Sequence, residues 1–188
     1  MVPEARESAL VVLVPEAEAV AGPCRASYDP SAAWGVPAHV TVLYPFKPPE
    51  AMTDADLDAL RQLFARFPRF EFALTEVRRF PNALYLAPEP AAPFQALTEA
   101  VGLLYPEYPP YEGEFDEVIP HLTLASTKDG AQLDQIADEF ARSCLGKLPV
   151  QARAHAVVLM DDRAGTWQVR EVFPLAQFTG SHSSDEEM

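Results

Sequence analysis

The stretch Pro37-Ala-His-Val-Thr-Val-Leu-Tyr-Pro-Phe46 returns later in the chain, altered but recognisable, as Pro120-His-Leu-Thr-Leu-Ala-Ser126. Each copy has a histidine two residues before a threonine, with aliphatic residues between and after them. Short apolar runs bounded by proline are typical of β-strands. Residues i and i+2 of a strand lie on the same face, so each copy presents one imidazole and one hydroxyl together. The two copies predict one shared cleft that contains His39, Thr41, His121 and Thr123.

A single His-x-Thr copy has an ordinary structural interpretation, in which a strand histidine is satisfied by a nearby hydroxyl group. Threonine fills only 8 of 188 positions, so two matches among four histidines favour a functional origin. The other two histidines lack the pattern. We interpret His155 as structural, because no threonine follows two residues later, and His182 as a solvated residue of the tail.

Length and composition favour one domain. With 188 residues, 48% of them hydrophobic, the chain can bury a sizeable core, and we expect a single domain of two lobes over residues 1–178. Residues 179–188 are small, polar and acidic and are expected to be disordered. No apolar run approaches the roughly 20 residues of a membrane span. We therefore expect a cytoplasmic monomer without a membrane partner, with Cys24 and Cys144 as free thiols.

The net charge limits the partners. The chain carries 14 basic residues against 28 acidic ones, a formal net charge of -14. Proteins that hold long nucleic acids draw most of their affinity from lysine and arginine contacts to phosphates. A long duplex is therefore excluded as a partner, whereas a small nucleotide or an RNA end, held by a few local contacts, fits.

The order of predicted elements also repeats. A strand, a helix, a loop, a motif strand, a helix and a strand occur twice, and a hairpin strand closes the chain. This order predicts an α+β, internally duplicated, bilobal fold in which two small, mostly antiparallel sheets face a central cleft, with helices on the outside. Besides the motif strands, the predicted strands are 8–14, 70–80, 82–88, 150–160 and 167–173, and the predicted helices are 16–26, interrupted at Gly22-Pro23, then 53–67, 93–104 and 131–145, with loops at 28–36 and 105–118.

Two imidazoles and two hydroxyls in one groove match the needs of in-line attack on a phosphodiester. One group must take a proton from the nucleophile, another must give a proton to the leaving oxygen, and donors must hold the other phosphate oxygens. Histidine can fill both proton roles near neutral pH. This scheme needs no metal or other cofactor, and His-x-Thr supplies only one good metal ligand per strand.

At these residues the chain resembles the 2H phosphoesterases, and within them the bacterial 2′-5′ RNA ligase-like (LigT-like) branch. The resemblance rests on the stretches 38–46 and 120–124, and the element order fits over roughly residues 8 to 175. It implies a bilobal α+β fold and metal-independent hydrolysis of 2′,3′-cyclic phosphates on nucleotides or RNA ends. In some members it also implies reversible 2′-5′ ligation of RNA ends. The resemblance further implies His121 as the base and His39 as the acid.

The chain departs from that branch after the second motif. Many members have an arginine shortly after the threonine, where this chain has Ala125-Ser126-Thr127-Lys128. The cationic contact to phosphate is therefore weaker or elsewhere, and Arg78 and Arg79 are the nearest replacements, although such a pair is more often a solvated edge. Aromatic residues near the motifs can stack on a base or simply pack in the core. The predicted substrate contacts are Tyr44, Phe46, Trp34, Phe115, Ser126 and Arg79.

Two functional hypotheses follow from the sequence. The first is a metal-independent cyclic phosphodiesterase acting on small nucleotides or RNA ends. The second is a non-catalytic nucleotide- or RNA-end-binding module on the same fold. The intact set of two histidines and two threonines favours the enzyme.

Overall fold

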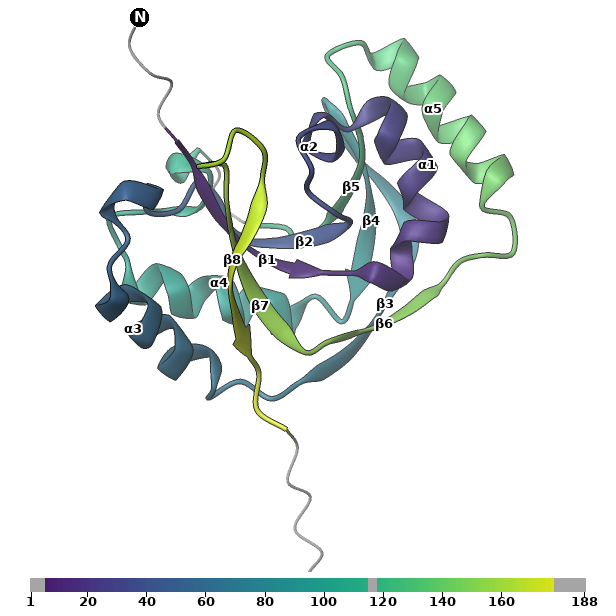
Figure 1. The fold of residues 1–188 in the computed structure, drawn as a ribbon. Coiled ribbons are helices and arrows are strands. Elements are labelled where there is room, and N and C mark those ends of the chain that lie inside the picture. The colour runs from purple at the N-terminus through teal and green to yellow at the C-terminus, as the bar shows by residue number, and fades with distance from the viewer. Residues whose placement is uncertain (1–5, 115–117, 178–188) are drawn as a thin grey trace, which may run out of the picture.

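The computed structural model describes residues 6–114 and 118–177, which form two antiparallel sheets flanked by helices (Figure 1). The strands are β1 (Ser8–Leu13), β2 (His39–Leu43), β3 (Phe70–Phe80), β4 (Ala83–Glu89), β5 (Leu122–Ser126), β6 (Val150–Ala154), β7 (Ala156–Asp161) and β8 (Gln168–Pro174). The helices are α1 (Glu18–Tyr28), α2 (Pro30–Ala33), α3 (Asp54–Phe64), α4 (Ala92–Leu104) and α5 (Gly130–Ser143), with 3₁₀ turns at Pro15–Ala17, Pro49–Ala51 and Pro110–Gly113.

The two sheets have the same internal order. The first sheet runs β2-β1-β7-β8 and the second runs β5-β4-β3-β6, and neighbouring strands are antiparallel in both. The two motif strands, β2 and β5, are thus edge strands. Their neighbours in the sheets, β1 and β4, are the first strands of the two repeats. Strands β2 and β5 contact one another, so the two motifs meet between the sheets.

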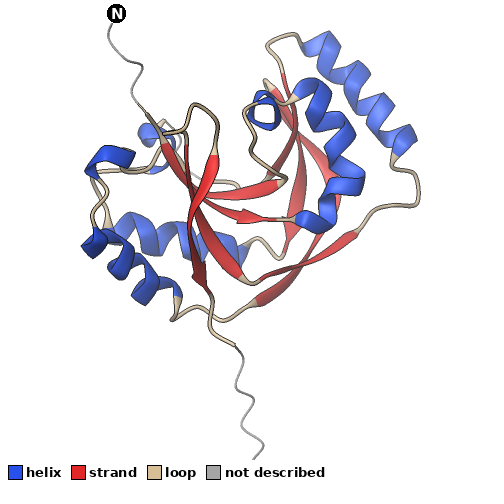
Figure 2. Ribbon diagram, in the orientation of Figure 1, coloured by secondary structure: helices blue, strands red, loops and turns tan. Residues whose placement is uncertain are grey.

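The repeats are interlocked rather than side by side. Elements β1-α1-β2-α3-β3 and β4-α4-β5-α5-β6 follow the same order, but β3 lies in the second sheet and β7 takes the matching place in the first. Helices α3 and α4 pack against the first sheet, and α1 and α5 pack against the second, so the helices flank the strands on both sides (Figure 2). The predicted α+β fold with two antiparallel sheets and outer helices is confirmed.

One predicted strand is in fact two. The segment 150–160 divides at His155, with β6 in the second sheet and β7 in the first. The burial pattern changes at the same point, because β6 alternates between buried and exposed residues whereas β7 is buried almost throughout. A strand covered on one face alternates, and a strand covered on both faces does not. The apolar composition concealed that change.

The predicted interruption of the first helix is wrong. Helix α1 continues through Pro23, and the expected loop after it contains the short helix α2. A proline inside a helix costs about 3 kcal/mol or more. Helix α1 nevertheless continues, and it buries Ala21 and Arg25. The side chain of Asp29 caps α2 by accepting the N–H of Ser31 at 3.0 Å.

A single cluster of buried side chains joins both sheets to the helices. The predicted N-cap of α3 is confirmed as a capping box between Thr53 and Asp56. Asp56 also accepts the ammonium of Lys47 at 2.8 Å. Burial alone would raise the pKa of Asp56, but the hydrogen bonds from Lys47 and Thr53 hold it well below its usual range.

In the described part of the chain, no helix has the length and apolarity needed to cross a membrane.

Candidate active site

Both motif histidines are held in the same way. The Nδ1–H of His39 donates to the carbonyl of Pro37 at 2.8 Å, and the Nδ1–H of His121 donates to the carbonyl of Ile119 at 2.7 Å. In each case the acceptor lies two residues earlier in the chain. A hydrogen bond at one ring nitrogen selects the tautomer and leaves the other nitrogen for chemistry. The Nε2 atom of each ring is therefore the one available in the cleft.

The surroundings of both rings favour the neutral form of the imidazole. Burial lowers the pKa of His39 to about 4, and burial also lowers the pKa of His121. The hydrogen bonds to the two carbonyls act in the opposite direction but are outweighed. The rings are near enough for a charge on His121 to lower the pKa of His39 further. An anion between them would reverse these effects, because it favours the protonated form.

The threonines share the faces of their histidines, as the alternation predicts. Thr41 lies opposite Val11 of β1, and Thr123 lies opposite Tyr85 of β4. Both threonines are partly exposed, whereas the valines and leucines between the motif residues are buried. Each hydroxyl is thus accessible on the face that its strand turns away from the helices.

The loop before the second motif also reaches the first. Tyr111 and Glu112 have left-handed backbones, with φ of 50° and 55°. The N–H of Tyr111 donates to the carbonyl of Tyr44 at 2.7 Å. The hydroxyl of Tyr111 lies within hydrogen-bonding reach of Thr41. Such conformations cost roughly 1–3 kcal/mol per residue and gather at functional sites. Tyr111, one of the aromatic residues near the motifs, therefore belongs to the cleft.

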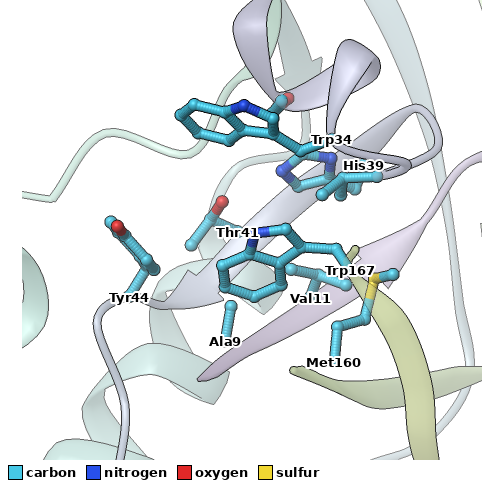
Figure 3. A pocket seen from close by; sticks show the side chains of 10 residues that line it. Ala9, Val11, Trp34, His39, Thr41, Tyr44, Met160 and Trp167 are labelled. Atoms are coloured by element: carbon cyan, nitrogen blue, oxygen red, sulfur yellow. The ribbon is translucent and has the colours of Figure 1, made fainter. Parts of the chain in front are cut away.

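An apolar pocket of about 170 Å³ opens beside His39 (Figure 3). We call it the indole pocket because Trp34 and Trp167 lie on it, one directly after α2 and one in the turn before β8. The backbone N–H of Trp167 donates to the carbonyl of Trp34 at 2.9 Å, so the two indole-bearing segments are tied together. The pocket is lined by Ala9, Val11, Ser31, Trp34, Val36, His39, Thr41, Tyr44, Met160 and Trp167.

The second motif lies against aromatic rings instead. The ring of His121 meets Phe80 edge to face, with centroids 5.1 Å apart, and meets Tyr85 at 5.5 Å. Phe80 and Tyr85 stack on one another at 4.3 Å and an interplanar angle of 24°. These contacts fix the plane of the His121 ring.

A buried ion pair supports the loop before His39. The Nε–H of Arg25 donates to Asp29 at 2.9 Å, and an Nη2–H of the same side chain donates to the carbonyl of Val36 at 3.0 Å. On the other side of the loop, the Ala38 N–H donates to Glu18 at 2.6 Å. The backbone that leads into the first motif is therefore held from both sides.

The predicted substrate contacts fall into different places. Trp34 and Tyr44 line the indole pocket, and Ser126 is exposed at the end of β5. Phe46 is buried in the core against Tyr105, which corrects its assignment to the cleft. Phe115 lies outside the described residues.

Arg79 also lies elsewhere than predicted. Its guanidinium pairs with Asp134 and donates to the carbonyl of Gly130 at 3.2 Å, so it faces α5 on the helix-covered side of the second sheet. Arg78 lies opposite Tyr85 and so takes the cleft face. Trp167 was missed because the only local signal was its position at the start of a hairpin strand; its part in the pocket depends on contacts with residues more than a hundred positions away.

Comparisons with known proteins identify the superfamily of the chain. The model of the 2′-5′ RNA ligase superfamily matches residues 13–166, which is most of the chain. The chain belongs to the 2′-5′ RNA ligase superfamily. The predicted resemblance to the 2H phosphoesterases is thereby confirmed at the level of the superfamily. A search of the curated proteins found no match.

Solved structures share the fold of this superfamily member. TT0787 of Thermus thermophilus has a TM-score of 0.60 and 21% identity, covering 92% of this chain and 99% of that chain. LigT of E. coli in complex with 3′-AMP has a TM-score of 0.59 and 14% identity, covering 93% of this chain and 100% of that chain. LigT in complex with NADP⁺ has a TM-score of 0.57 and 17% identity, covering 93% and 99%. At these identities the likeness shows the fold.

Proposed function

We propose that this superfamily member is a metal-independent phosphodiesterase that hydrolyses the 2′,3′-cyclic phosphates of small nucleotides or RNA ends. The observation that carries the proposal is the matched anchoring of the two histidines, each with Nδ1 on a carbonyl and Nε2 available between the sheets. Two equally anchored imidazoles supply a general base and a general acid. Thr41 and Thr123 are the hydroxyl donors for the remaining phosphate oxygens.

The indole pocket supports the proposed roles of the two histidines, with His39 as the acid and His121 as the base. Flat aromatic walls suit a nucleobase, since base stacking on aromatic side chains is worth about 1–3 kcal/mol per base. A nucleoside bound there places its ribose on the His39 side of the cleft. The ribose oxygen is the leaving group when the cyclic phosphate opens, so His39 is the acid and His121 is the base. In-line attack then brings water from the opposite side.

Each proton and bond in this step is accounted for. Nε2 of His121 takes a proton from water as the water oxygen bonds to phosphorus. The bond from phosphorus to one ribose oxygen breaks, and the Nε2–H of His39 gives its proton to that oxygen. The products are a nucleoside monophosphate and two histidines whose protonation is the reverse of that at the start. Solvent exchange restores them.

The ligands bound by the structural neighbour LigT and the charge pattern of this chain both support a small substrate. LigT was crystallised with 3′-AMP and with NADP⁺, both of which combine a nucleoside with phosphate. On the cleft face of the second sheet, Arg78 pairs with Glu76 and Arg153 pairs with Glu71. Because these cations are already matched by carboxylates, that face gives a long phosphate backbone little attraction. The monomeric state and cytoplasmic location stay predictions.

The decisive experiment is turnover of the four nucleoside 2′,3′-cyclic phosphates by purified protein, with and without EDTA. We expect hydrolysis of at least one nucleotide at a rate that EDTA leaves unchanged, because side chains alone carry the proton transfers. No group of three or more histidine, cysteine, aspartate or glutamate side chains suited to a metal occurs within the described ranges. Tight binding of 3′-AMP without any turnover would instead support a binding module, and loss of rate restored by a divalent ion would contradict the metal-free scheme.

The pH profile tests the two-histidine scheme independently. At low pH the base becomes protonated and at high pH the acid loses its proton, so kcat/KM should be bell-shaped. Burial lowers both pKa values below the usual 6.5, so the maximum of kcat/KM is expected on the acid side of pH 6.5. The apparent pKa values that the two limbs of the profile report belong to the coupled pair of histidines and not to either residue alone. The bound phosphodiester anion favours protonated histidine, so the maximum of kcat should lie at higher pH than the maximum of kcat/KM. A kcat/KM maximum above pH 8 would contradict the two-histidine scheme.

A further inference from the structure

The interlocked repeats allow the two halves of the cleft to be compared position by position. Because the sheets have the same strand order, β1 matches β4 and β7 matches β3. Val11 lies opposite Thr41 in the first sheet, and Tyr85 lies opposite Thr123 in the second. Val11 and Tyr85 therefore occupy equivalent positions next to the two motif threonines.

A second pair of equivalent positions differs in the same sense. Met160 of β7 pairs with Ala9, and Phe80 of β3 pairs with Ala83. The first sheet thus has a floor of Ala9, Val11 and Met160, and these three side chains line the indole pocket. The second sheet has Ala83, Tyr85 and Phe80 at the same places. The two halves share one backbone plan but differ in side-chain volume beside the motif.

The larger rings of the second half pack against each other and against the second motif. Phe80 and Tyr85 stack at 4.3 Å, Tyr85 is only 4% exposed, and both rings contact the imidazole of His121. At the positions whose small side chains border the indole pocket in the first half, the second half thus has two large rings that stack on each other and contact His121.

We infer that the His121 side of the cleft is closed to a second nucleoside, so that the nucleophile is water and the protein does not join two RNA ends. The inference rests on the proposed function. Joining two ends requires the 5′-hydroxyl oxygen of a second nucleoside to bond to phosphorus in place of water, with its proton passing to His121. The ribose oxygen leaves with a proton from His39, as in hydrolysis. The chemistry is the same, and only the room beside His121 separates the two outcomes.

The test is to give the second half the side chains of the first. The variant Phe80→Met with Tyr85→Val copies Met160 and Val11, and Tyr85→Phe is the matched control that keeps the ring. Adenosine 2′,3′-cyclic phosphate is incubated with an excess of uridine, and the ratio of dinucleoside monophosphate to nucleoside monophosphate is measured by mass spectrometry. We expect only hydrolysis by the native protein and by Tyr85→Phe, and at least a tenfold higher ratio for the double variant.

Methanol in place of uridine tests size alone. Its hydroxyl is small enough to take the position of water, so methyl ester formation should compete equally in native protein and double variant. The dinucleoside product from the native protein at the level of the double variant would overturn the inference. So would a folded double variant that hydrolyses the substrate but forms no more dinucleoside product than the native protein.

Binding provides a readout that does not depend on turnover. In a calorimetric titration with adenosine 3′-monophosphate we expect one site per native chain and a second, weaker site in the double variant, with circular dichroism to confirm folding. Two sites in the native chain would overturn the inference, and so would one site in a folded double variant. If no protein shows turnover but the titrations behave as expected, the proposed hydrolysis fails while the closed half-site stands.

Discussion

His39→Ala and His121→Ala are each expected to lower kcat/KM for a 2′,3′-cyclic nucleotide by about 10²-fold or more, the usual effect of losing a general acid or base. Each substitution removes the ring nitrogen that its half of the cleft offers to the reacting atoms. The two residues act in one proton-transfer step, so the double variant should be little worse than the more damaged single variant. Initial rates over a range of substrate concentrations measure the effect.

His155→Ala is the matched control for these variants. His155 is exposed at the crossing between β6 and β7, and its contribution to the fold is a backbone carbonyl that accepts the Leu175 N–H at 2.9 Å. Its kcat/KM should stay at the native value. A folded His39 or His121 variant with near-native kcat/KM would show that one motif is a structural relic, and the proposed mechanism would then be wrong.

The positions of the polar residues of the cleft could be predicted because they depend only on the two-residue alternation of side chains along a strand. His39 and Thr41, like His121 and Thr123, need only the alternation of a strand to share a face. The carbonyls that hold the rings could not be predicted, because they depend on the turn geometry at Pro37 and Ile119.

Arg79 shows how one local irregularity changes a prediction. Phe70, Phe72 and Leu74 alternate on the core side of β3, and continued alternation would turn Arg79 to the cleft. The strand has a bulge between Leu74 and Glu76, and an extra residue moves every later side chain to the other face. Arg78 therefore faces the cleft and Arg79 faces α5. Nothing in the apolar pattern marks the bulge.

The indole pocket lay beyond sequence reasoning for a different reason. Its two tryptophans lie 133 positions apart, and they meet because β7 returns to the sheet of β1 after the chain has built the whole second sheet. That return is a swap of equivalent strands between the repeats. The duplicated order of elements predicts two similar halves, but it cannot say which strand completes which sheet.

Arg25→Met is expected to lower the free energy of unfolding by about 3–5 kcal/mol, the usual cost of removing one partner from a buried ion pair. Arg25 and Asp29 are 2% and 6% exposed, so the substitution leaves a carboxylate and the carbonyl of Val36 buried without their partner. Urea unfolding, followed by circular dichroism, measures the change.

Arg61→Met provides the matched control for this loss of stability. Arg61 pairs with Asp58 at the exposed surface of α3, where such a pair contributes about 0–1 kcal/mol. A further variant, Arg25→Met with Asp29→Leu, should recover part of the stability because it no longer buries an unpaired charge. It should not recover activity, since Asp29 caps the helix that leads to Trp34 and Arg25 holds the loop that leads to His39. A loss below 1 kcal/mol for Arg25→Met would show that water enters beside α1 and that the first motif is positioned by its strand alone.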